Sequence, residues 1–345
     1  MKKISFCTRY DTQGASSRLR FFMYKKLLEE NGITPRFQPL LSNGYLKRLY
    51  SRKDTRFHAI CSMTKRFASL PFLGRELFIE YELLPFIPLK IEQYFLKNRK
   101  YILSFDDAVW EKYNNNPSLA GKFEKLSSCA KGVIVANDVL KRHLEKYNSN
   151  IIKIPTAIDL DRYTGICTEK SSRFTVVWIG TPVTYRECLM PFANMLKKAS
   201  EKVDFELLVV AKKDLPAIDG VNMSFADWSD DMEIDLLKRA HIGIMPLPEN
   251  DFMRGKSAYK LIQYLGAGLP CIASPVGENN VLFSQANIGF TASTTEKWIE
   301  SLQKLSSDAV LYNQLSQNAM SLAKEYSIQK YAPVMADFIK KCFDI

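Results

Sequence analysis

The sequence predicts an α/β protein of two domains, each built on a parallel β-sheet. Its 345 residues exceed the usual size of a single domain, and its hydrophobic content of 46% is ordinary for a globular protein. Short apolar runs alternate with segments of helical periodicity, a pattern typical of parallel strands joined by crossover helices. No short-period repeat or low-complexity tract interrupts this alternation.

The first half opens with a predicted βα unit. Ile4–Cys7 has the pattern of a buried strand, and Gly32 ends the helix that follows. One face of that helix is expected to carry Leu19, Phe22, Met23 and Leu27. Three more strands are expected at Tyr101–Phe105, Gly132–Ala136 and Ile151–Ile154, and a helix at Ala136–Tyr147.

The second half is expected to repeat this architecture after a polar segment, Thr164–Arg173, that carries no periodicity. Its predicted strands are Phe174–Ile179, Phe205–Ala211, Ile242–Leu247 and Cys271–Ala273. The last segment, Tyr326–Phe343, has a helical pattern with no strand after it and is expected to pack across both domains. The predicted domains are therefore 1–165 and 166–325, with a crossover helix in 326–345.

The net charge of +11 favours anionic partners such as nucleotide phosphates, nucleic acid or acidic lipid. The excess is concentrated in residues 36–100, which hold thirteen basic side chains against five acidic ones. The basic residues are Arg36, Lys47, Arg48, Arg52, Lys53, Arg56, Lys65, Arg66, Arg75, Lys90, Lys97, Arg99 and Lys100. Because no recognised nucleic-acid module accompanies them, they favour contact with an anionic membrane surface over nucleic-acid binding.

Several features predict a cytoplasmic location. The N-terminus has no apolar stretch of signal-peptide length, and the most apolar region, residues 77–96, is interrupted by four charged residues. Membrane contact is therefore expected to be peripheral. The seven cysteines are odd in number and have no metal-binding spacing, which favours reduced thiols.

The strongest local signal is RGKSAYKLIQYLGAGLPCIASPVG, residues 254–277, which follows the predicted strand Ile242–Leu247. A buried helix face is predicted by apolar residues at positions i, i+3, i+4 and i+7: Ala258, Leu261, Ile262 and Leu265. Lys256, Lys260 and Gln263 share another face, which is either simply solvated or binds a ligand.

Electrostatics favour ligand binding on that second face. Arg254 and Lys256 are expected at the helix N-terminus, where the dipole disfavours each cation by about 0.3–1 kcal/mol. A bound anion reverses this penalty, and free N–H groups at a helix start bind phosphate. The position beyond the carboxyl end of a strand is also where open α/β sheets bind ligands. Together these features predict a diphosphate site.

Four segments resemble the retaining glycosyltransferases of family 4, which have the GT-B fold. LIQYLGAGLPCIASPVG at 261–277 is similar to the family's "(L/F)xEAMAxGxPVVAxxxG" segment, and HIGIMPLP at 241–248 is similar to the strand before it. IPTAIDLDRY at 154–163 resembles the "IPNGVDxxxF" signature, and SFCTRYDTQGASSRLR at 5–20 resembles the start of the acceptor-side domain.

This resemblance implies two Rossmann-like domains that face each other across a cleft. It implies transfer of a sugar from a nucleoside diphosphate sugar to a glycan or lipid-linked acceptor, with retention, in cell-envelope polysaccharide or lipopolysaccharide synthesis. No metal or other cofactor is then required. The family commonly has two donor-site glutamates eight residues apart, where this chain has Gly255 and Gln263. Gln263 can still hydrogen-bond a ribose hydroxyl, and the chain looks closer to a sub-branch with "RGKxxxKLxQY", whose lysines hold the diphosphate.

Two residues of the second half are further donor-site candidates. Gly180 follows the strand Phe174–Ile179 and either lets the backbone approach a phosphate or makes an ordinary strand-to-helix turn. The resemblance favours donor contact. Arg186 lies near the place where the family often has a phosphate-binding arginine.

Adjacent carboxylates mark the other domain. Asp106 and Asp107 follow the strand Tyr101–Phe105, and Glu80 and Glu82 lie in the segment FIEYELLPF. Such residues either cap a helix or pair with arginine, or they orient the acceptor and support an oxocarbenium-like transition state. The family often has histidine at position 106, so no role is carried over to Asp106.

Two other functions remain open on the sequence. A sugar-nucleotide epimerase shares the two-domain architecture, and only Asp106 and Asp107 offer it acid/base groups. A non-catalytic binding protein would explain the missing glutamates at 255 and 263. Asp159 and Asp161 have the spacing of a metal-binding pair but are expected to cap or turn the chain, and no dinucleotide fingerprint supports redox chemistry.

Overall fold

The computed structural model describes residues 2–164 and 169–345 and divides the chain into two compact units. Unit 1 holds the chain up to Ala157 together with Gly255–Ser257 and Ile328–Ile345. Unit 2 holds Ile158–Arg254 and Ala258–Ser327. The domain boundary predicted between residues 165 and 166 lies outside the described residues.

Unit 1 is built on a six-stranded parallel sheet with the order β2-β1-β3-β4-β5-β6. Its strands are β1 (Lys2–Cys7), β2 (Ile33–Phe37), β3 (Glu76–Glu80), β4 (Lys100–Phe105), β5 (Gly132–Val135) and β6 (Ile151–Lys153). Four of these were predicted to within one or two residues of their ends. β2 was missed because Pro35 and Arg36 interrupt its apolar pattern, which an edge strand tolerates.

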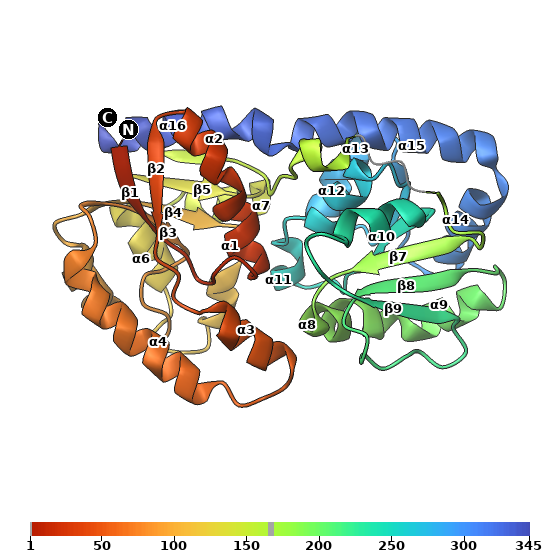
Figure 1. Ribbon diagram of the computed structural model, residues 1–345, viewed down its shortest axis with the longest axis horizontal. Helices are drawn as coiled ribbons and strands as arrows, with labels where there is room; N and C mark the ends of the chain where they lie inside the picture. Colours follow the sequence, from red (N-terminus) through yellow and green to blue (C-terminus); the bar gives the residue numbers. More distant parts are fainter. Residues whose placement is uncertain (1, 165–168) are drawn as a thin grey trace. The chain divides into compact units, whose positions relative to one another are not determined.

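Helices cover this sheet on both faces (Figure 1). They are α1 (Ala15–Arg20), α2 (Lys25–Glu30), α3 (Asn43–Tyr50), α4 (Arg56–Ser69), α5 (Leu89–Leu96), α6 (Lys122–Cys129), α7 (Asp138–Leu144) and α16 (Ile328–Phe343). The C-terminal helix α16 lies beside α2, and its Met335 and Ile339 belong to the same hydrophobic cluster as the buried residues of β1. The last helix of the chain therefore completes the first unit.

The helical region after β1 corrects one prediction. The expected continuous helix is broken at Phe21, where φ is −132° and ψ −60°, and a 3₁₀ turn separates α1 from α2. The break changes the phase of the buried face, so that Phe21, Tyr24 and Leu28 are buried. Of the four residues predicted to line the core, only Leu19 is fully buried.

Unit 2 has a second six-stranded parallel sheet, with the order β12-β11-β10-β7-β8-β9. Its strands are β7 (Thr175–Ile179), β8 (Glu206–Ala211), β9 (Met223–Asp227), β10 (Ile242–Met245), β11 (Cys271–Ala273) and β12 (Gly289–Thr291). Its helices are α8 (Pro182–Thr184), α9 (Ala193–Ser200), α10 (Glu233–Arg239), α11 (Asp251–Arg254), α12 (Tyr259–Gly266), α13 (Glu278–Gln285), α14 (Thr295–Ser307) and α15 (Ala309–Ala323). The two missed strands, β9 and β12, lie at the sheet edges and are only partly buried.

Each sheet has a point where its strand order reverses. In unit 1 the chain runs from β1 outward to β2 and then returns to place β3 on the other side of β1. In unit 2 it runs from β7 outward to β9 and returns to place β10 on the other side of β7. Ligands of open α/β sheets bind at the carboxyl ends of the strands that flank such a switch point, so the residues after β1, β3, β7 and β10 are the first to consider.

Candidate active site

A tyrosine separates the two strands at the switch point of unit 2. The Tyr264 hydroxyl on α12 accepts a hydrogen bond from the Ile179 amide of β7 at 3.1 Å and donates to the Ile244 carbonyl of β10 at 3.2 Å. These backbone groups face each other at the ends of strands that pair directly only over Ile242 and Gly243. The buried phenol therefore spreads the carboxyl ends of β7 and β10, where a ligand of this sheet is expected.

Close packing fixes this tyrosine. A Cβ atom on Gly243 would lie 2.3 Å from the Tyr264 ring, so β10 accommodates the phenol only because position 243 has no side chain. The periodic residues of α12 also behave as predicted, since Ala258, Leu261, Ile262 and Leu265 are all buried. The face of α12 that packs on the sheet is thus rigid.

Lys260 lies in the first turn of α12, next to this switch point. Its ammonium group is 5.3 Å from the ring centroid of Trp178, a buried residue of β7. The helix begins after Ala258, which adopts a left-handed conformation with φ 51° and gives no side-chain cap to the first N–H groups. Strained backbone of this kind is concentrated at functional sites, and the uncapped start of α12 beside Lys260 suits an anion.

The structure corrects the predicted positions of Arg254 and Lys256. Arg254 ends α11, and its guanidinium is already paired with Glu249 at 2.5 Å and Asp251 at 2.8 Å. Lys256 lies three residues before the first residue of α12. Helical structure is interrupted between α11 and α12, so neither Arg254 nor Lys256 is in the first turn of α12. The argument from the helix dipole therefore applies to Lys260 alone.

Gln263 is a buried member of a hydrogen-bonded chain. Its amide donates to Glu233 on α10 at 2.7 Å, and the same carboxylate accepts from the Trp228 indole at 2.5 Å. Trp228 directly follows β9, so this chain also lies at the carboxyl edge of the sheet. Glu233 places a carboxylate beside Gln263, a contact that the sequence spacing did not indicate.

Gly180 follows β7 and packs tightly against the same tryptophan as Lys260. A Cβ atom there would lie 2.4 Å from the Trp178 ring and 2.7 Å from the Thr184 hydroxyl, and the Gly180 amide donates to Val210 at 3.1 Å. These contacts give a packing reason for glycine at this position. Arg186 lies in the π-helical turn Tyr185–Leu189 after α8 and is exposed.

We expect Gly180→Ala to lower the free energy of unfolding by about 1–3 kcal/mol, because the added methyl group overpacks against the Trp178 ring. Gly44→Ala is the matched control, since its Cβ would meet only the Ser42 hydroxyl at an ordinary 3.5 Å. Denaturant unfolding of both variants measures the difference. Equal stability of the two would contradict the tight packing of Gly180.

In unit 1, Asp106 and Asp107 follow β4 at the carboxyl edge of the sheet. Asp106 is buried and accepts a hydrogen bond from the Tyr81 hydroxyl, while Asp107 is half-buried. Neither caps the next 3₁₀ turn, Val109–Lys112, which has no side-chain cap. The helix-capping interpretation of these two aspartates is therefore wrong.

Burial raises the pKa of Asp106 to about 7, and the carboxylates of Asp107 and Glu80 act in the same direction. A carboxyl group with such a pKa exchanges a proton near neutral pH, which general acid or base catalysis requires. Burial also raises the pKa of Glu80, the last residue of β3. The acidic groups at the ends of β3 and β4 thus form a cluster at one sheet edge, in which burial raises the pKa of Asp106 and of Glu80.

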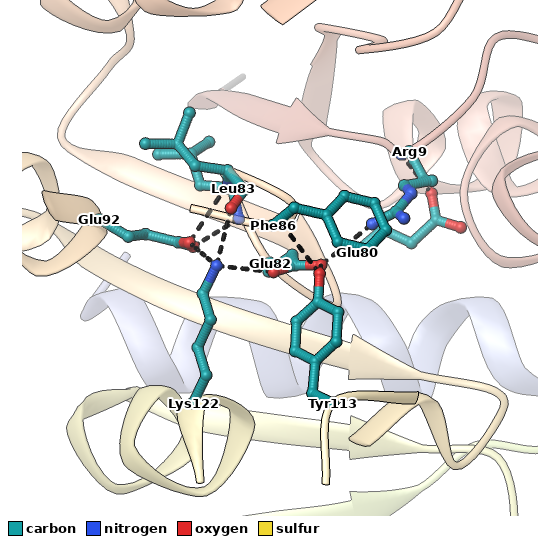
Figure 2. Close-up of polar contacts among 9 residues, drawn as sticks. Arg9, Glu80, Glu82, Leu83, Phe86, Glu92, Tyr113 and Lys122 are labelled. Carbon is teal, nitrogen blue, oxygen red and sulfur yellow. Dashed lines mark hydrogen bonds and ion pairs between the residues drawn. The ribbon is translucent and has the colours of Figure 1, made fainter. Parts of the chain in front are cut away.

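A network of ion pairs adjoins this cluster (Figure 2). The fully buried Lys122 ammonium contacts Glu82 at 2.7 Å and Glu92 at 2.8 Å, and Glu82 also accepts from Tyr113 at 2.8 Å and from Arg9 at 3.0 Å. The sequence indicated Glu82 only as one acidic residue near a strand end. Its partners come from segments up to 73 residues away, so spacing could not reveal them.

Asp159 and Asp161 behave as predicted. The Asp159 carboxylate accepts from the Asp161 amide at 3.2 Å and caps the 3₁₀ turn Leu160–Tyr163. The Asp159 side chain therefore caps the turn, as expected.

No family model matches the sequence, and no curated protein is similar to it in sequence. Solved structures resemble it along its whole length. A glycosyltransferase from Rickettsia africae has a TM-score of 0.68 at 14% identity and covers 99% of this chain and 98% of its own. The glycosyltransferase WaaG, involved in lipopolysaccharide biosynthesis, has a TM-score of 0.68 at 14% identity, over 97% of this chain and 99% of its own.

Anabaena HepE, solved in complex with UDP-glucose, has a TM-score of 0.68 at 11% identity over 99% of this chain and 100% of its own. The chain has the GT-B fold. The two parallel sheets of units 1 and 2 are its two Rossmann-like domains, as the sequence predicted. At these identities the likeness establishes the fold, and the activity has to be argued from the residues at the two switch points.

Proposed function

We propose that this protein is a glycosyltransferase that moves a sugar from a nucleoside diphosphate sugar to a glycan or lipid-linked acceptor, with retention. The observation that supports this most is Lys260 at the uncapped start of α12, beside the β7–β10 switch point of a GT-B fold. HepE, which shares the fold, was solved with UDP-glucose bound. The reaction belongs in synthesis of a cell-envelope polysaccharide or lipopolysaccharide, at the cytoplasmic face of the membrane.

On the donor side, Lys260 and Lys256 contact the diphosphate, and Gln263 holds a ribose hydroxyl. The Glu233 carboxylate orients the Gln263 amide from behind, at 2.7 Å. Gly180 and Arg186 contribute at the end of β7, and Arg254 plays a lesser part because two carboxylates already neutralise it. No metal or other cofactor is needed, since lysine ammonium groups compensate the charge of the diphosphate.

On the acceptor side, Asp106 and Asp107 are the catalytic candidates. Asp106 exchanges its proton near pH 7, so it can relay the proton that the acceptor hydroxyl loses to the departing nucleoside diphosphate. The Tyr81 hydroxyl fixes the orientation of its carboxylate. Asp107 supports positive charge on the sugar in the transition state.

A panel of sugar nucleotides, with and without extracted lipid acceptor, tests this proposal. A transferase releases nucleoside diphosphate faster when acceptor is present, and an epimerase interconverts the sugar without it. A binding protein does neither but retains the nucleotide in a titration. Absence of nucleotide binding and of product across the panel would exclude the proposed activity.

Membrane contact is the second part of the proposal. No helix in the described part of the chain is long and apolar enough to cross a membrane. In α4 and the turn after it, however, Phe57, Ile60 and Phe72 are 73%, 65% and 88% exposed, beside the exposed basic residues Arg52, Lys53, Arg56, Lys65 and Arg75. This combination suits peripheral binding to anionic lipid.

The structure also removes residues from the predicted membrane patch. Arg66 is buried and donates to the Gln38 carbonyl at 2.7 Å, so it cannot reach a lipid surface. Leu46, Leu70 and Leu73, which lie among the basic residues of this patch in the sequence, are core residues and cannot contact lipid either. The exposed residues of α4 and of the turns beside it therefore remain as a part of residues 36–100 that fits a membrane.

We expect reversal of three exposed charges in and just before α4, Lys53→Glu with Arg56→Glu and Lys65→Glu, to weaken binding to acidic vesicles by roughly 100-fold. Each basic residue near an anionic surface contributes about 1 kcal/mol. The same reversal at Lys198, Lys202 and Lys324 of unit 2, which are exposed, is the control. Co-sedimentation at two salt concentrations measures the binding, and equal binding of the wild type to neutral and acidic vesicles would contradict the proposal.

A further inference from the structure

In the loop between β3 and α5 of unit 1, an aromatic side chain is exposed to solvent on a strained backbone. Phe86 is 68% exposed and has a φ of 60°, in the left-handed region that side chains other than glycine rarely adopt. Tyr81, at the start of the same loop, has a φ of 61°. Each such residue costs about 1–3 kcal/mol and persists only where its surroundings impose it.

Buried groups impose the path of this loop (Figure 2). The Glu92 carboxylate accepts from the amides of Leu83 at 2.6 Å and Leu84 at 3.3 Å, and the Phe86 amide donates to the Tyr113 hydroxyl at 2.9 Å. The Phe86 and Tyr113 rings lie 5.5 Å apart. The backbone of the loop is therefore held just before the exposed ring and at the amide of Phe86 itself.

The ion pairs beneath the loop contribute geometry more than stability. Lys122, Glu82 and Glu92 are at most 5% exposed, and removing such charges from water offsets most of what their attraction contributes. What the pairs do achieve is a fixed position for Glu82, which holds the Arg9 guanidinium at 3.0 Å. A rigid support of this kind is characteristic of a binding site.

Arg9 reaches the same place from β1, across the switch point of the sheet. Its amide donates to Glu80 at 2.7 Å, so carboxylates on either side of Tyr81 hold both its backbone and its side chain. The guanidinium carbon lies 5.9 Å from the centroid of the Phe86 ring. The β1–β3 switch point, where a ligand of this sheet is expected, thus presents an arginine beside an aromatic ring.

We propose that Arg9 and Phe86 form a subsite for a pyranose ring of the acceptor. The apolar face of the sugar packs on the exposed Phe86 ring, and its hydroxyl groups accept from Arg9, which has five N–H donors and gives one to Glu82 through Nη1. Aromatic surface with a few fixed polar groups is how proteins bind small polar ligands. The assignment to the acceptor rests on the proposed function.

Charge favours a neutral sugar over a phosphate at this subsite. Arg9 and Lys122 are balanced by Glu82 and Glu92 within the network itself. An anion would therefore meet little net positive charge, whereas sugar hydroxyl groups need only directed donors.

The test is binding of simple glycosides to the whole protein without nucleotide, by saturation-transfer NMR. The panel comprises methyl glycosides of hexoses, N-acetylhexosamines, 6-deoxyhexoses and heptoses. For the glycosides that bind the wild type, we expect Phe86→Ala to weaken affinity about tenfold or more and Phe86→Trp to retain it. Arg9→Lys keeps the charge beside Glu82 but loses the planar fork, and should also weaken binding. Tyr94→Ala, which removes another exposed aromatic ring of unit 1, is the matched control.

Two results would overturn the subsite: no glycoside of the panel binds the wild type, or Phe86→Ala binds them as tightly as the wild type does. If Phe86→Ala instead loses affinity only for neutral phosphatidylcholine vesicles, the ring contacts lipid and the sugar subsite is wrong. Nucleoside diphosphate affinity is measured separately. Loss of glycoside binding with unchanged nucleotide binding concerns the subsite alone, while a wild type that binds glycosides but no nucleotide would contradict the proposed function alone.

Discussion

Lys260→Ala weakens binding of the donor nucleoside diphosphate by tenfold or more, and Lys256→Ala does the same. A hydrogen bond to a charged group contributes about 1.5–3 kcal/mol, and each 1.4 kcal/mol corresponds to a factor of ten. The effect is expected to be larger for Lys260, which lies in the first turn of α12, where the backbone N–H groups lack a side-chain cap. Calorimetric titration of the nucleotide that binds the wild type measures it.

Stability without ligand separates this role from a structural one. Lys260→Ala loses its contact with the Trp178 ring, worth about 0.5–1 kcal/mol at a partly exposed site, but removes a cation from the positive end of the helix dipole. These terms nearly cancel, so the melting temperature should hardly change. Lys202→Ala, which removes an exposed lysine of unit 2, should alter neither property. Unchanged nucleotide affinity with lost stability would show that Lys260 supports the fold.

The central strands of both sheets were predictable because parallel strands are buried on both faces and appear as continuous apolar runs. β7 and β8 are such runs. β2, β9 and β12 lie at sheet edges, where one side needs no partner and the apolar pattern weakens. β3 was missed for another reason, since its five residues run directly into a further apolar segment and no turn residue follows Glu80 to mark where the strand ends.

The donor site was partly predictable for a related reason. The periodicity of α12 gave its buried face correctly, because that property is local to the helix. Periodicity could not show that the helix is interrupted at Gly255–Ser257, so Arg254 was assigned to α12 when it belongs to α11. Nor could it show that Tyr264 separates two strands or that Gln263 meets Glu233, since these contacts depend on the register of the whole sheet.

On the acceptor side, the sequence showed that carboxylates lie at two strand ends, but it could not show their pKa values or their partners. The Asp106 pKa is raised by burial, by the adjacent Asp107 and by Glu80 of β3, and burial is a property of the folded unit. The Lys122–Glu82–Arg9 connection joins three segments distant in sequence. A single sequence contains no sign of which basic residue meets which acid.

Asp106→Asn is expected to make the protein more stable at pH 8 and to lower its rate of sugar transfer. The Asp106 pKa is about 7 in the folded protein against 3.8 for the ordinary group. Well below pH 4 the carboxyl group is protonated in both the folded and the unfolded protein and does not lower the free energy of unfolding. As the pH rises to 7, the unfolded chain releases this proton more readily than the folded one, so stability falls, and above pH 7 the full cost is present.

Asparagine removes this cost while its amide oxygen still accepts from the Tyr81 hydroxyl. The stability gained by Asp106→Asn should therefore grow by roughly 3 kcal/mol between pH 5 and pH 8. Urea unfolding at several pH values measures this, with Glu145→Gln as the control that removes an exposed carboxylate of unit 1. If wild type and Asp106→Asn change in parallel with pH, the Asp106 pKa is not raised.

The same variant then distinguishes a catalytic from a structural role of Asp106, because the two roles predict the same stability profile but different rates of sugar transfer. A catalytic Asp106 gives a more stable but slower enzyme whose affinity for the nucleoside diphosphate is unchanged, since the donor residues proposed here lie elsewhere in the sequence. A purely structural Asp106 gives the same stability profile with wild-type transfer. A buried carboxylate with a strongly raised pKa is typical of catalytic sites, so the slower and more stable variant is the expected result.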